Sequence, residues 1–321
     1  MINPKVVALG GGHGLAVTLA ALRTITEDVT AIVTVADNGG SSGRLRDEFG
    51  VLPPGDLRMA LAALCSDDEW GRGWAEIMQY RFTSSGPLNG HALGNLLLTA
   101  LWDRDGDRVQ AIARVGELLQ IRGRVLPMAL DPLDIEGTFN SAYGRKIVRG
   151  QVEVATTKGR VESLRLIPED PRATPESLEA IAQADWITIG PGSWFSSVMP
   201  HFLLREQAEA IAASSAKKIV IFNLPEPESE DEFAGSSAQE HLELITQHLP
   251  DLHIDFAIAD RVSVSQSPAS PASPASPASL GLKEVVEGCG GALILADVAE
   301  SPGSFHHDPA KLGPVLRHIF N

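Results

Sequence analysis

Near the start of the chain, apolar runs alternate with a glycine-rich turn and a helical pattern. Residues 5–9 form a continuous apolar run, residues 15–23 repeat apolar positions at helical spacing, and residues 29–36 form a second apolar run. Continuous apolar runs of this length are typical of parallel strands that are buried on both faces. A strand, a glycine turn, a helix and a second strand predict a right-handed βαβ unit.

The same alternation returns in the second half of the chain. Residues 186–189, 219–223, 256–259 and 293–296 predict further strands, and residues 309–320 predict a C-terminal helix. Strands that alternate with helices build a mostly parallel sheet covered on both faces. We therefore predict an α/β protein with a three-layer Rossmann-like fold, formed by residues 1–321 as a single domain.

Residues 140–170 interrupt this rhythm. Residues 145–154 and 161–166 alternate apolar and polar positions, and Lys158-Gly159 lies between them. Two segments of period two that are joined by a short glycine turn indicate a β-hairpin. We predict a β-hairpin excursion from the main sheet.

A Ser-Pro-Ala repeat occupies residues 267–279. The repeat has no bulky apolar side chain, and its prolines disfavour both a helix and a central strand. It predicts an extended, disordered insert.

The first candidate binding element is the turn Gly10-Gly11-Gly12-His13-Gly14. Backbone amides and the positive end of the following helix favour a phosphate there, and glycine allows its close approach. The spacing is not the regular G-x-G-x-x-G, so it does not specify a dinucleotide. A tight turn with no ligand is the alternative interpretation. We assign Gly11, Gly12 and His13 as candidate phosphate contacts.

The second candidate element, residues 37–44, follows the second strand. In this architecture an acidic residue at that strand end meets a ribose or base. The glycines and serines that follow fit an anion-binding nest or a metal-bound phosphate, and an arginine can add a bidentate contact. The candidate nucleotide contacts are Asp37, Asn38, Gly40, Ser41, Ser42 and Arg44, and Asp37 is also the candidate metal ligand.

Other polar residues follow predicted strands or begin predicted helices. Asp56 is either a helix N-cap or a ligand contact, and His91 and Asn95 are spaced to share one helix face. Loops at the carboxyl ends of parallel strands meet at one sheet edge, where ligands bind. The remaining candidates in such loops are Gly190, Gly192, Ser193 and Asn223.

The composition and net charge of the chain limit the classes of partner that it can bind. The chain of 321 residues carries a net charge of −15, which argues against nucleic acid or an anionic membrane as the main partner. An anionic ligand must then be held by local amides and a few arginines. The two cysteines, Cys65 and Cys289, give no disulfide framework, and we see no signal peptide or membrane-spanning pattern. We predict a cytoplasmic protein.

Six stretches together resemble the gluconeogenesis-factor (YvcK-type) branch of the CofD-like, or 2-phospho-L-lactate transferase, superfamily. They are VVALGGGHG, TVADNGGSSGRLR, PPGDLRMALAAL, GHALGNLLL, GPGSWFSSVMP and HHDPAKL. Their order and spacing agree over essentially the whole chain outside the Ser-Pro-Ala repeat. The resemblance implies a Rossmann-like fold that binds UDP-sugars, with a role in cell shape and wall metabolism during gluconeogenic growth.

Three interpretations of the site remain open. The first is a nucleotide-sugar binder without turnover, and the second is a phospholactate-type transferase that uses Mg²⁺ held by Asp37 and Asp56. The family usually has two aspartates where this chain has Asp37-Asn38, which removes one charge from such a metal site. The third, a nicotinamide dehydrogenase, is supported by the first loop alone. The sequence leaves open the catalytic residues, the need for Mg²⁺ and whether the chain forms a homodimer.

Overall fold

The protein is built on a seven-stranded parallel sheet, which confirms the predicted α/β class. The computed structural model describes residues 3–141, 144–157, 160–224, 238–261 and 277–321. The strand order is β10-β9-β8-β7-β1-β2-β3, and every neighbouring pair is parallel. The strands are β1 (Val6–Gly10), β2 (Val29–Val33), β3 (Arg124–Pro127), β7 (Trp186–Ile189), β8 (Lys217–Ile221), β9 (Phe256–Asp260) and β10 (Ala292–Ala296).

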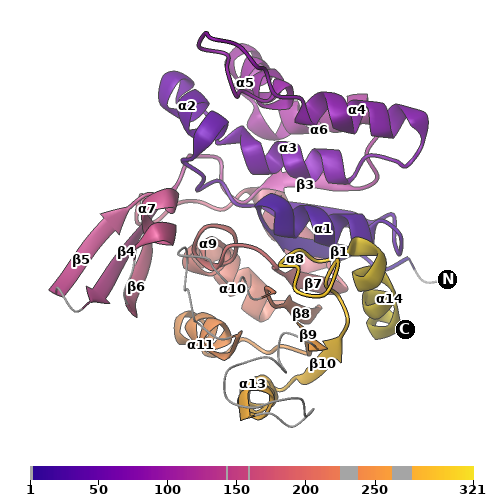
Figure 1. The fold of residues 1–321 in the computed structure, drawn as a ribbon, viewed down its shortest axis with the longest axis vertical. Helices are drawn as coiled ribbons and strands as arrows, with labels where there is room; N and C mark the ends of the chain where they lie inside the picture. The colour runs from indigo at the N-terminus through magenta and orange to yellow at the C-terminus, as the bar shows by residue number, and fades with distance from the viewer. Residues whose placement is uncertain (1–2, 142–143, 158–159, 225–237, 262–276) are drawn as a thin grey trace.

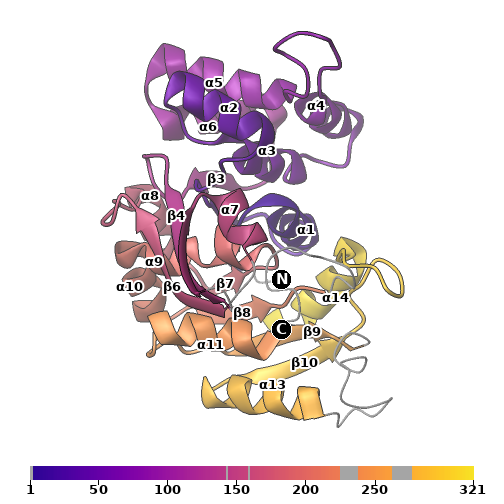
Figure 2. The same cartoon turned by 60° about the vertical axis from the view of Figure 1, so that its left-hand side comes forward.

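The strands wind outward from β1 in two directions. The chain first runs from β1 through β2 to β3, then returns to the other side of β1 and continues from β7 to β10. Because parallel crossovers are right-handed, this reversal places helices on both faces of the sheet. Figures 1 and 2 show α1, α3 and α6 on one side and α10, α11 and α13 on the other.

Most helices belong to one of these two layers. The C-terminal helix packs against the first helix, and its Phe320 ring lies 4.7 Å from the Trp186 ring. The helices are α1 (Gly12–Leu22), α2 (Gly40–Phe49), α3 (Pro54–Ala63), α4 (Glu69–Gln79), α5 (Leu93–Asp105), α6 (Arg108–Leu119), α7 (Gln151–Thr156), α8 (Pro175–Gln183), the π-helical turn η1 (Trp194–Val198), α9 (Pro200–Leu203), α10 (Arg205–Ala213), α11 (Ala238–His248), α13 (Pro277–Gly288) and α14 (Pro309–Phe320).

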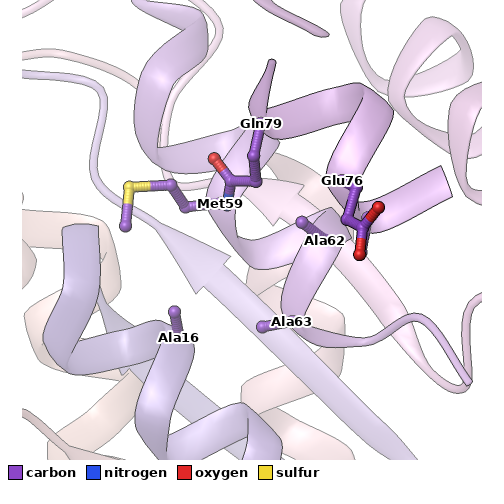
Figure 3. A pocket seen from close by; sticks show the side chains of 7 residues that line it. Ala16, Met59, Ala62, Ala63, Glu76 and Gln79 are labelled. Carbon is purple, nitrogen blue, oxygen red and sulfur yellow. The ribbon is translucent and has the colours of Figure 1, made fainter. Parts of the chain in front are cut away.

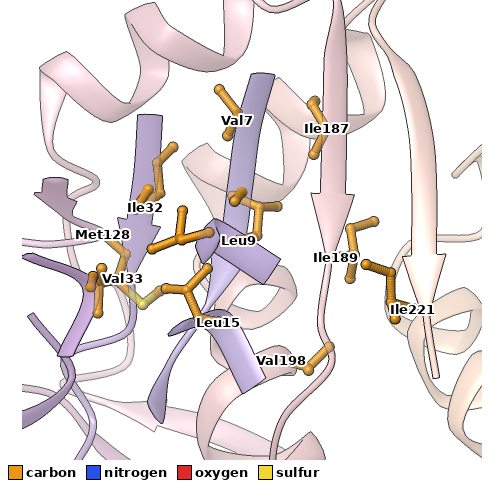
Figure 4. Packing of buried hydrophobic residues seen from close by; sticks show 14 of the residues in the cluster. Val7, Leu9, Leu15, Ile32, Val33, Met128, Ile187, Ile189, Val198 and Ile221 are labelled. Atoms are coloured by element: carbon orange, nitrogen blue, oxygen red, sulfur yellow. The ribbon is translucent and has the colours of Figure 1, made fainter. Parts of the chain in front are cut away.

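The central strands form the core. All residues of β1 and β2 are buried, as the continuous apolar runs predict. Leu9 from β1, Ile32 from β2 and Ile189 from β7 lie on neighbouring strands in Figure 4, with Leu15 of α1 close to Leu9. This packing fixes the strand ends from which the candidate loops leave.

The excursion from the sheet differs from the predicted hairpin. It is a three-stranded antiparallel sheet of order β5-β4-β6, formed by β4 (Asp134–Ser141), β5 (Gly144–Arg149) and β6 (Arg160–Ile167). The two segments that we expected to pair with each other both pair with β4. The central strand β4 was missed because its Asp134, Glu136 and Gly137 break the apolar pattern. Residues 151–156, expected to extend a strand, form α7 instead.

Other element bounds also differ from the predictions. The first helix begins within the glycine turn, at Gly12, and the second candidate loop turns into α2 at Gly40. Helix α13 begins at Pro277, inside the Ser-Pro-Ala repeat, while residues 262–276 lie outside the described part of the chain. Among the residues that the structure describes, no helix combines the length and apolar character needed to cross a membrane.

Candidate functional site

The candidate loops meet where the strand order reverses. The turns that follow β1 and β7 leave from adjacent strands, and the chain winds away from them in opposite directions. In open α/β sheets this switch point is the usual ligand crevice. A Cβ atom on Gly14 would overlap the carbonyl group of Pro191, so the two turns touch through their backbones. The predicted convergence of these two loops is therefore present.

Gly11 lies at the centre of the crevice floor. A Cβ atom there would overlap the carboxylate of Asp56 and would approach Thr34 Cγ2 to 2.6 Å and Ser197 Oγ to 3.1 Å. These neighbours come from α3, from the end of β2 and from η1. Three segments that are far apart in sequence thus surround one glycine.

The start of α2 and the start of α3 join the same crevice. Asp37 Oδ1 accepts the Gly39 N–H at 2.8 Å, and Ser42 Oγ accepts the Gly55 N–H at 3.0 Å. The expectation that Asp56 caps its helix is wrong, because α3 begins at Pro54 and its N-cap is Pro53. Asp56 lies in the first turn, where its carboxylate instead accepts the N–H of Gly12. It therefore links α3 to the glycine turn.

Asp37 and Asp56 form an electrostatically coupled carboxylate pair. Burial and, to a smaller extent, the charge of Asp37 raise the pKa of Asp56 to about 7, whereas the Gly12 N–H and the charge of Arg58 oppose the rise. Burial also raises the pKa of Asp37, against hydrogen bonds from the Gly39 N–H and the Ser42 hydroxyl. Two partly desolvated carboxylates that repel each other favour a proton or a cation between them.

This pair fits a divalent cation with few protein ligands. Mg²⁺ commonly binds one or two carboxylates and completes its shell with water and substrate phosphates. Within the described residues no group of three or more His, Cys, Asp or Glu side chains has the geometry of a metal cage. Asp37 and Asp56 would hold such an ion only together with oxygens of a ligand.

Two of the glycines assigned to the ligand have backbone amides that already have partners. Asp56 accepts the Gly12 N–H, and Asn223 Oδ1 accepts the Gly192 N–H at 2.8 Å. Asn223 Nδ2 also donates to the Gly192 carbonyl at 2.8 Å, so this side chain clamps the second turn. An anion that uses these amides must displace the side chains, or lie beside them.

A buried polar chain connects the remaining candidates. His91 Nδ1 lies 3.0 Å from Ser41 Oγ, which accepts a hydrogen bond from Asn95 Nδ2 at 3.0 Å. Asn95 Oδ1 in turn accepts the Nε–H of Arg58 at 2.9 Å. The expectation that His91 and Asn95 share one helix face is wrong, because α5 begins at Leu93 and His91 precedes it, but both side chains contact Ser41. Ser41 is the residue that joins them.

Two predicted contacts are used elsewhere in the fold. Asn38 donates to Glu153 Oε2 at 3.1 Å and accepts the Val152 N–H at 3.2 Å, so it ties α7 to the crevice edge. Arg44 donates to the carbonyls of Pro87 and Asn89, which holds the segment before α5. In this structure both side chains therefore hold neighbouring segments of the protein.

The rest of the predicted residues lie around the rim. His13 is exposed, whereas Gly190, at φ 70°, is buried beneath the second turn, with its carbonyl 3.4 Å from Thr18 Oγ1. Ser193 caps η1 by accepting the N–H of Ser196. Gly40 adopts φ 49° at the start of α2 and has open space around it. These positions line the crevice without a shared polar network.

Sequence reasoning missed three residues of the site, which are Thr34, His201 and Gln207. Thr34 borders Gly11, together with Ser197 from the serine-rich turn after β7, and Arg58 follows Asp56 by two residues on α3. Buried His201 hydrogen-bonds the Gly10 carbonyl at 3.3 Å through Nε2, and Gln207 Nε2 contacts its Nδ1 at 2.6 Å. Burial lowers the pKa of His201 to about 4, so the ring is neutral and fixes the start of the glycine turn. Only the position of Thr34 after a strand could have signalled a role.

A separate groove lies on the side of α1, α3 and α4. Its lining residues are Ala16, Met59, Ala62, Ala63, Ala75, Glu76 and Gln79, as Figure 3 shows. None of the predicted site residues belongs to it. The carboxylates and glycine turns therefore mark a different place from this mostly apolar groove.

The fold and the site define a doubly wound α/β protein with a polar crevice at its switch point. The chain belongs to the CofD family, described as 2-phospho-L-lactate transferase CofD, which matches residues 6–280. A Listeria innocua protein named gluconeogenesis factor is 38% identical over 82% of this chain and 79% of its own length. A Mycobacterium leprae protein, described as a candidate gluconeogenesis factor, is 45% identical over 98% of this chain and 85% of its own.

A solved structure has the same fold. The crystal structure of a upf0052 family member from Bacillus halodurans has a TM-score of 0.82 and 32% sequence identity. The alignment covers 98% of this chain and 99% of that chain. The family resemblance given by the six motifs is therefore confirmed.

Crowding at Gly11 generates a first prediction. The backbone of Gly11 is extended, at φ −164°, so an alanine there is opposed by contact with Asp56 and Thr34 and not by backbone strain. We expect Gly11→Ala to lower the free energy of unfolding by about 1–3 kcal/mol, measured by urea denaturation.

Gly73→Ala is the matched control for this prediction. A Cβ atom at Gly73, inside α4, meets nothing within 4 Å, and alanine should stabilise that helix by about 0.5–1 kcal/mol. Equal stability changes in the two variants would contradict the packing described for Gly11.

The buried carboxylate pair generates a pH prediction. The pKa of Asp56 in the folded state, about 7, lies above its ordinary value of 3.8. Between these two pH values the folded state therefore keeps a proton on Asp56 that the unfolded state has lost. The contribution of Asp56 to stability therefore falls as the pH rises through this window and is constant above it. Asp56→Asn removes the titrating group, and asparagine can still accept the Gly12 N–H.

Urea denaturation of the wild type and Asp56→Asn at a series of pH values tests this. The variant should gain stability relative to the wild type from about pH 4 to pH 7, with no further gain at higher pH. Asp251→Asn, at an exposed position, is the control for loss of a surface carboxylate. A stability difference that stays flat between pH 4 and pH 7 would show that Asp56 is not buried with a raised pKa.

Proposed function

We propose that the crevice binds a nucleotide diphosphate sugar of the UDP-sugar type. The observation that carries the proposal is the backbone contact between the turns after β1 and β7, at the point where the sheet reverses its winding. Ligands of open α/β sheets bind at this place. The UDP-sugar itself comes from the family resemblance.

Helix ends supply the local field that an anionic ligand needs. The N-termini of α1, α2 and α3 meet around Gly11, Asp37 and Gly55. Each helix N-terminus carries a partial positive charge, which favours phosphate even in a protein of net charge −15. None of these three helices has a side-chain hydrogen bond from its N-cap residue.

We propose that the protein acts as a binder rather than a catalyst. In this proposal it works in the cytoplasm and regulates cell shape and wall metabolism during gluconeogenic growth. Its relatives are named for gluconeogenesis, and the free thiols of Cys65 and Cys289 are compatible with a reducing compartment. The preferred sugar would be selected by the rim residues around the second turn.

A metal-dependent transferase of the phospholactate type is the second candidate. Its support is the carboxylate pair Asp37 and Asp56, together with the family description. A divalent ion there would neutralise charge on a diphosphate, which phosphoryl-type transfer requires. Asp37 and Asp56 would position that ion, while Arg58 and the helix ends hold the anionic oxygens.

Thermal denaturation with added ligands separates these candidates. The panel contains UDP-glucose, UDP-N-acetylglucosamine, GDP and NAD, each with and without Mg²⁺. A ligand at about 100 times its dissociation constant adds about 2.7 kcal/mol of stability, which shifts the midpoint measurably. Stabilisation by a UDP-sugar supports the binder. A response to GDP with Mg²⁺ and none to any UDP-sugar would favour the transferase and contradict the first proposal.

A pair of threonine variants tests the place of binding. The methyl group of Thr34, Cγ2, lies against Gly11, and Thr34 Oγ1 is buried without a hydrogen-bond partner among the described residues. Thr99 Oγ1, on α5, is likewise buried without a partner in that part of the chain. Valine has the same shape as threonine without the hydroxyl group. If the ligand brings a partner to Thr34, Thr34→Val should weaken UDP-sugar binding by about threefold to tenfold, in line with the net value of one hydrogen bond.

Thr99→Val should leave the affinity unchanged. Isothermal titration calorimetry with UDP-glucose measures both variants against the wild type. Equal affinities for all three proteins would remove Thr34 from the binding site.

A further inference from the structure

Two neighbouring arginines lack the ion pairs that most arginines of this acidic protein make. Ten arginines form ion pairs with Asp or Glu in the described part of the chain, but Arg58 and Arg81 form none there. Arg58 is only 3% exposed, and its Nη1 has no hydrogen-bond partner. A buried charge without a counter-ion is costly, so it marks a place where an anion is expected.

The start of α5 brings the two arginines together. The aliphatic part of Arg58 packs on Gly94, where a Cβ atom would come within 2.9 Å of Arg58 Cγ, and Arg58 Nε donates to Asn95. Arg81 forms a β-bridge with Ala92, and its Nη1 donates to the Gly90 carbonyl at 2.8 Å. Both side chains are thus anchored on one short segment, residues 90–95.

The positive charge at this place is only partly offset by the described residues. Burial, together with the positive charge of Arg81, lowers the pKa of Arg58 to about 10, and Asp56 opposes this shift only in part. Burial also lowers the pKa of His13, as do the charges of His306, Arg58 and Arg81. In addition, the N-terminus of α5 carries no acidic residue in its first turn, although its first N–H, that of Leu93, already donates to the Tyr80 carbonyl at 2.8 Å.

The arginines also lie next to the carboxylate side of the crevice. Asp56 is two residues before Arg58 on α3 and already occupies the Gly12 N–H. Because Asp56 occupies this amide, the glycine turn has fewer free N–H donors for an anion than the sequence predicted. A cationic side chain beside the turn supplies the missing attraction.

We propose that Arg58 and Arg81 form an oxyanion subsite beside the glycine turn, which binds a phosphoryl group of the ligand distal to the nucleoside. Arg81, which is exposed, makes the direct contact, and Arg58 provides the buried positive charge beneath it. Guanidinium groups bind phosphate oxygens through paired N–H donors, and their attraction weakens as salt screens it. The proposal rests on the proposed nucleotide site and names the part of it that holds the distal anion.

The test compares uridine nucleotides that differ in the second phosphate or in the sugar attached to it. Isothermal titration calorimetry with UMP, UDP and UDP-glucose is run on the wild type, Arg81→Met, Arg58→Met and Arg58→Lys. Arg81→Met should weaken UDP and UDP-glucose binding tenfold or more and UMP binding much less. The slope of UDP affinity against salt concentration should also become shallower. Arg58→Lys keeps the charge, so it should retain more UDP affinity than Arg58→Met.

Controls separate this inference from the proposed function. Arg72→Met removes an exposed arginine on α4 and should leave every affinity unchanged. If Arg58→Met does not fold, Arg81→Met still decides the question. Folded Arg81→Met with UDP affinity within twofold of the wild type would overturn the subsite while the nucleotide site stands.

Pyrophosphate tests whether the subsite binds a separate small phosphate compound instead of the phosphate of a nucleotide. If no uridine nucleotide binds the wild type but pyrophosphate stabilises it, and Arg81→Met abolishes that effect, a separate small phosphate compound occupies the subsite. In that case the subsite is supported and the proposed UDP-sugar function fails. No response to any of these anions would overturn both.

Discussion

The contact between Gly14 and the Pro191–Gly192 backbone is the constraint on which the site depends. A side chain at position 14 would overlap the Pro191 carbonyl, so only glycine lets α1 begin directly against the turn after β7. Because β1 and β7 are adjacent strands, this contact closes the switch point of the sheet into one polar crevice. The buried core under both strands holds the turns in register.

Local groups set the charges within the crevice. The helix ends and Arg58 are positive there, although the protein as a whole carries a net charge of −15. Asp37 and Asp56 lie at the positive ends of α2 and α3 and accept backbone N–H groups from neighbouring turns. Arg58 lies on the opposite side of Asp56 and has no paired carboxylate in the described residues. A phosphate ligand with a bound cation would neutralise both groups, because the cation pairs with the carboxylates and the phosphate pairs with Arg58. A neutral ligand would neutralise neither.

The sequence predicted the parts of this arrangement that depend on local patterns. The strands around β1, the two glycine turns and their meeting at one edge follow from apolar runs and the rules of parallel sheets. It could not show that Arg44 and Asn38 bind other loops, or that Arg58 is buried, because these depend on packing between distant segments. The strand β4 was missed for a similar reason, since its pairing with β5 and β6 stabilises a segment with little strand pattern of its own.

Hydrogen–deuterium exchange with saturating UDP-glucose tests the central claim most directly. Ligand in the crevice should slow amide exchange in residues 10–16 and 190–198 together, since the two turns form one wall. The first turns of α2 and α3 should be protected with them. Slower exchange confined to other parts of the described chain, such as the groove between α1 and α4, would contradict the account.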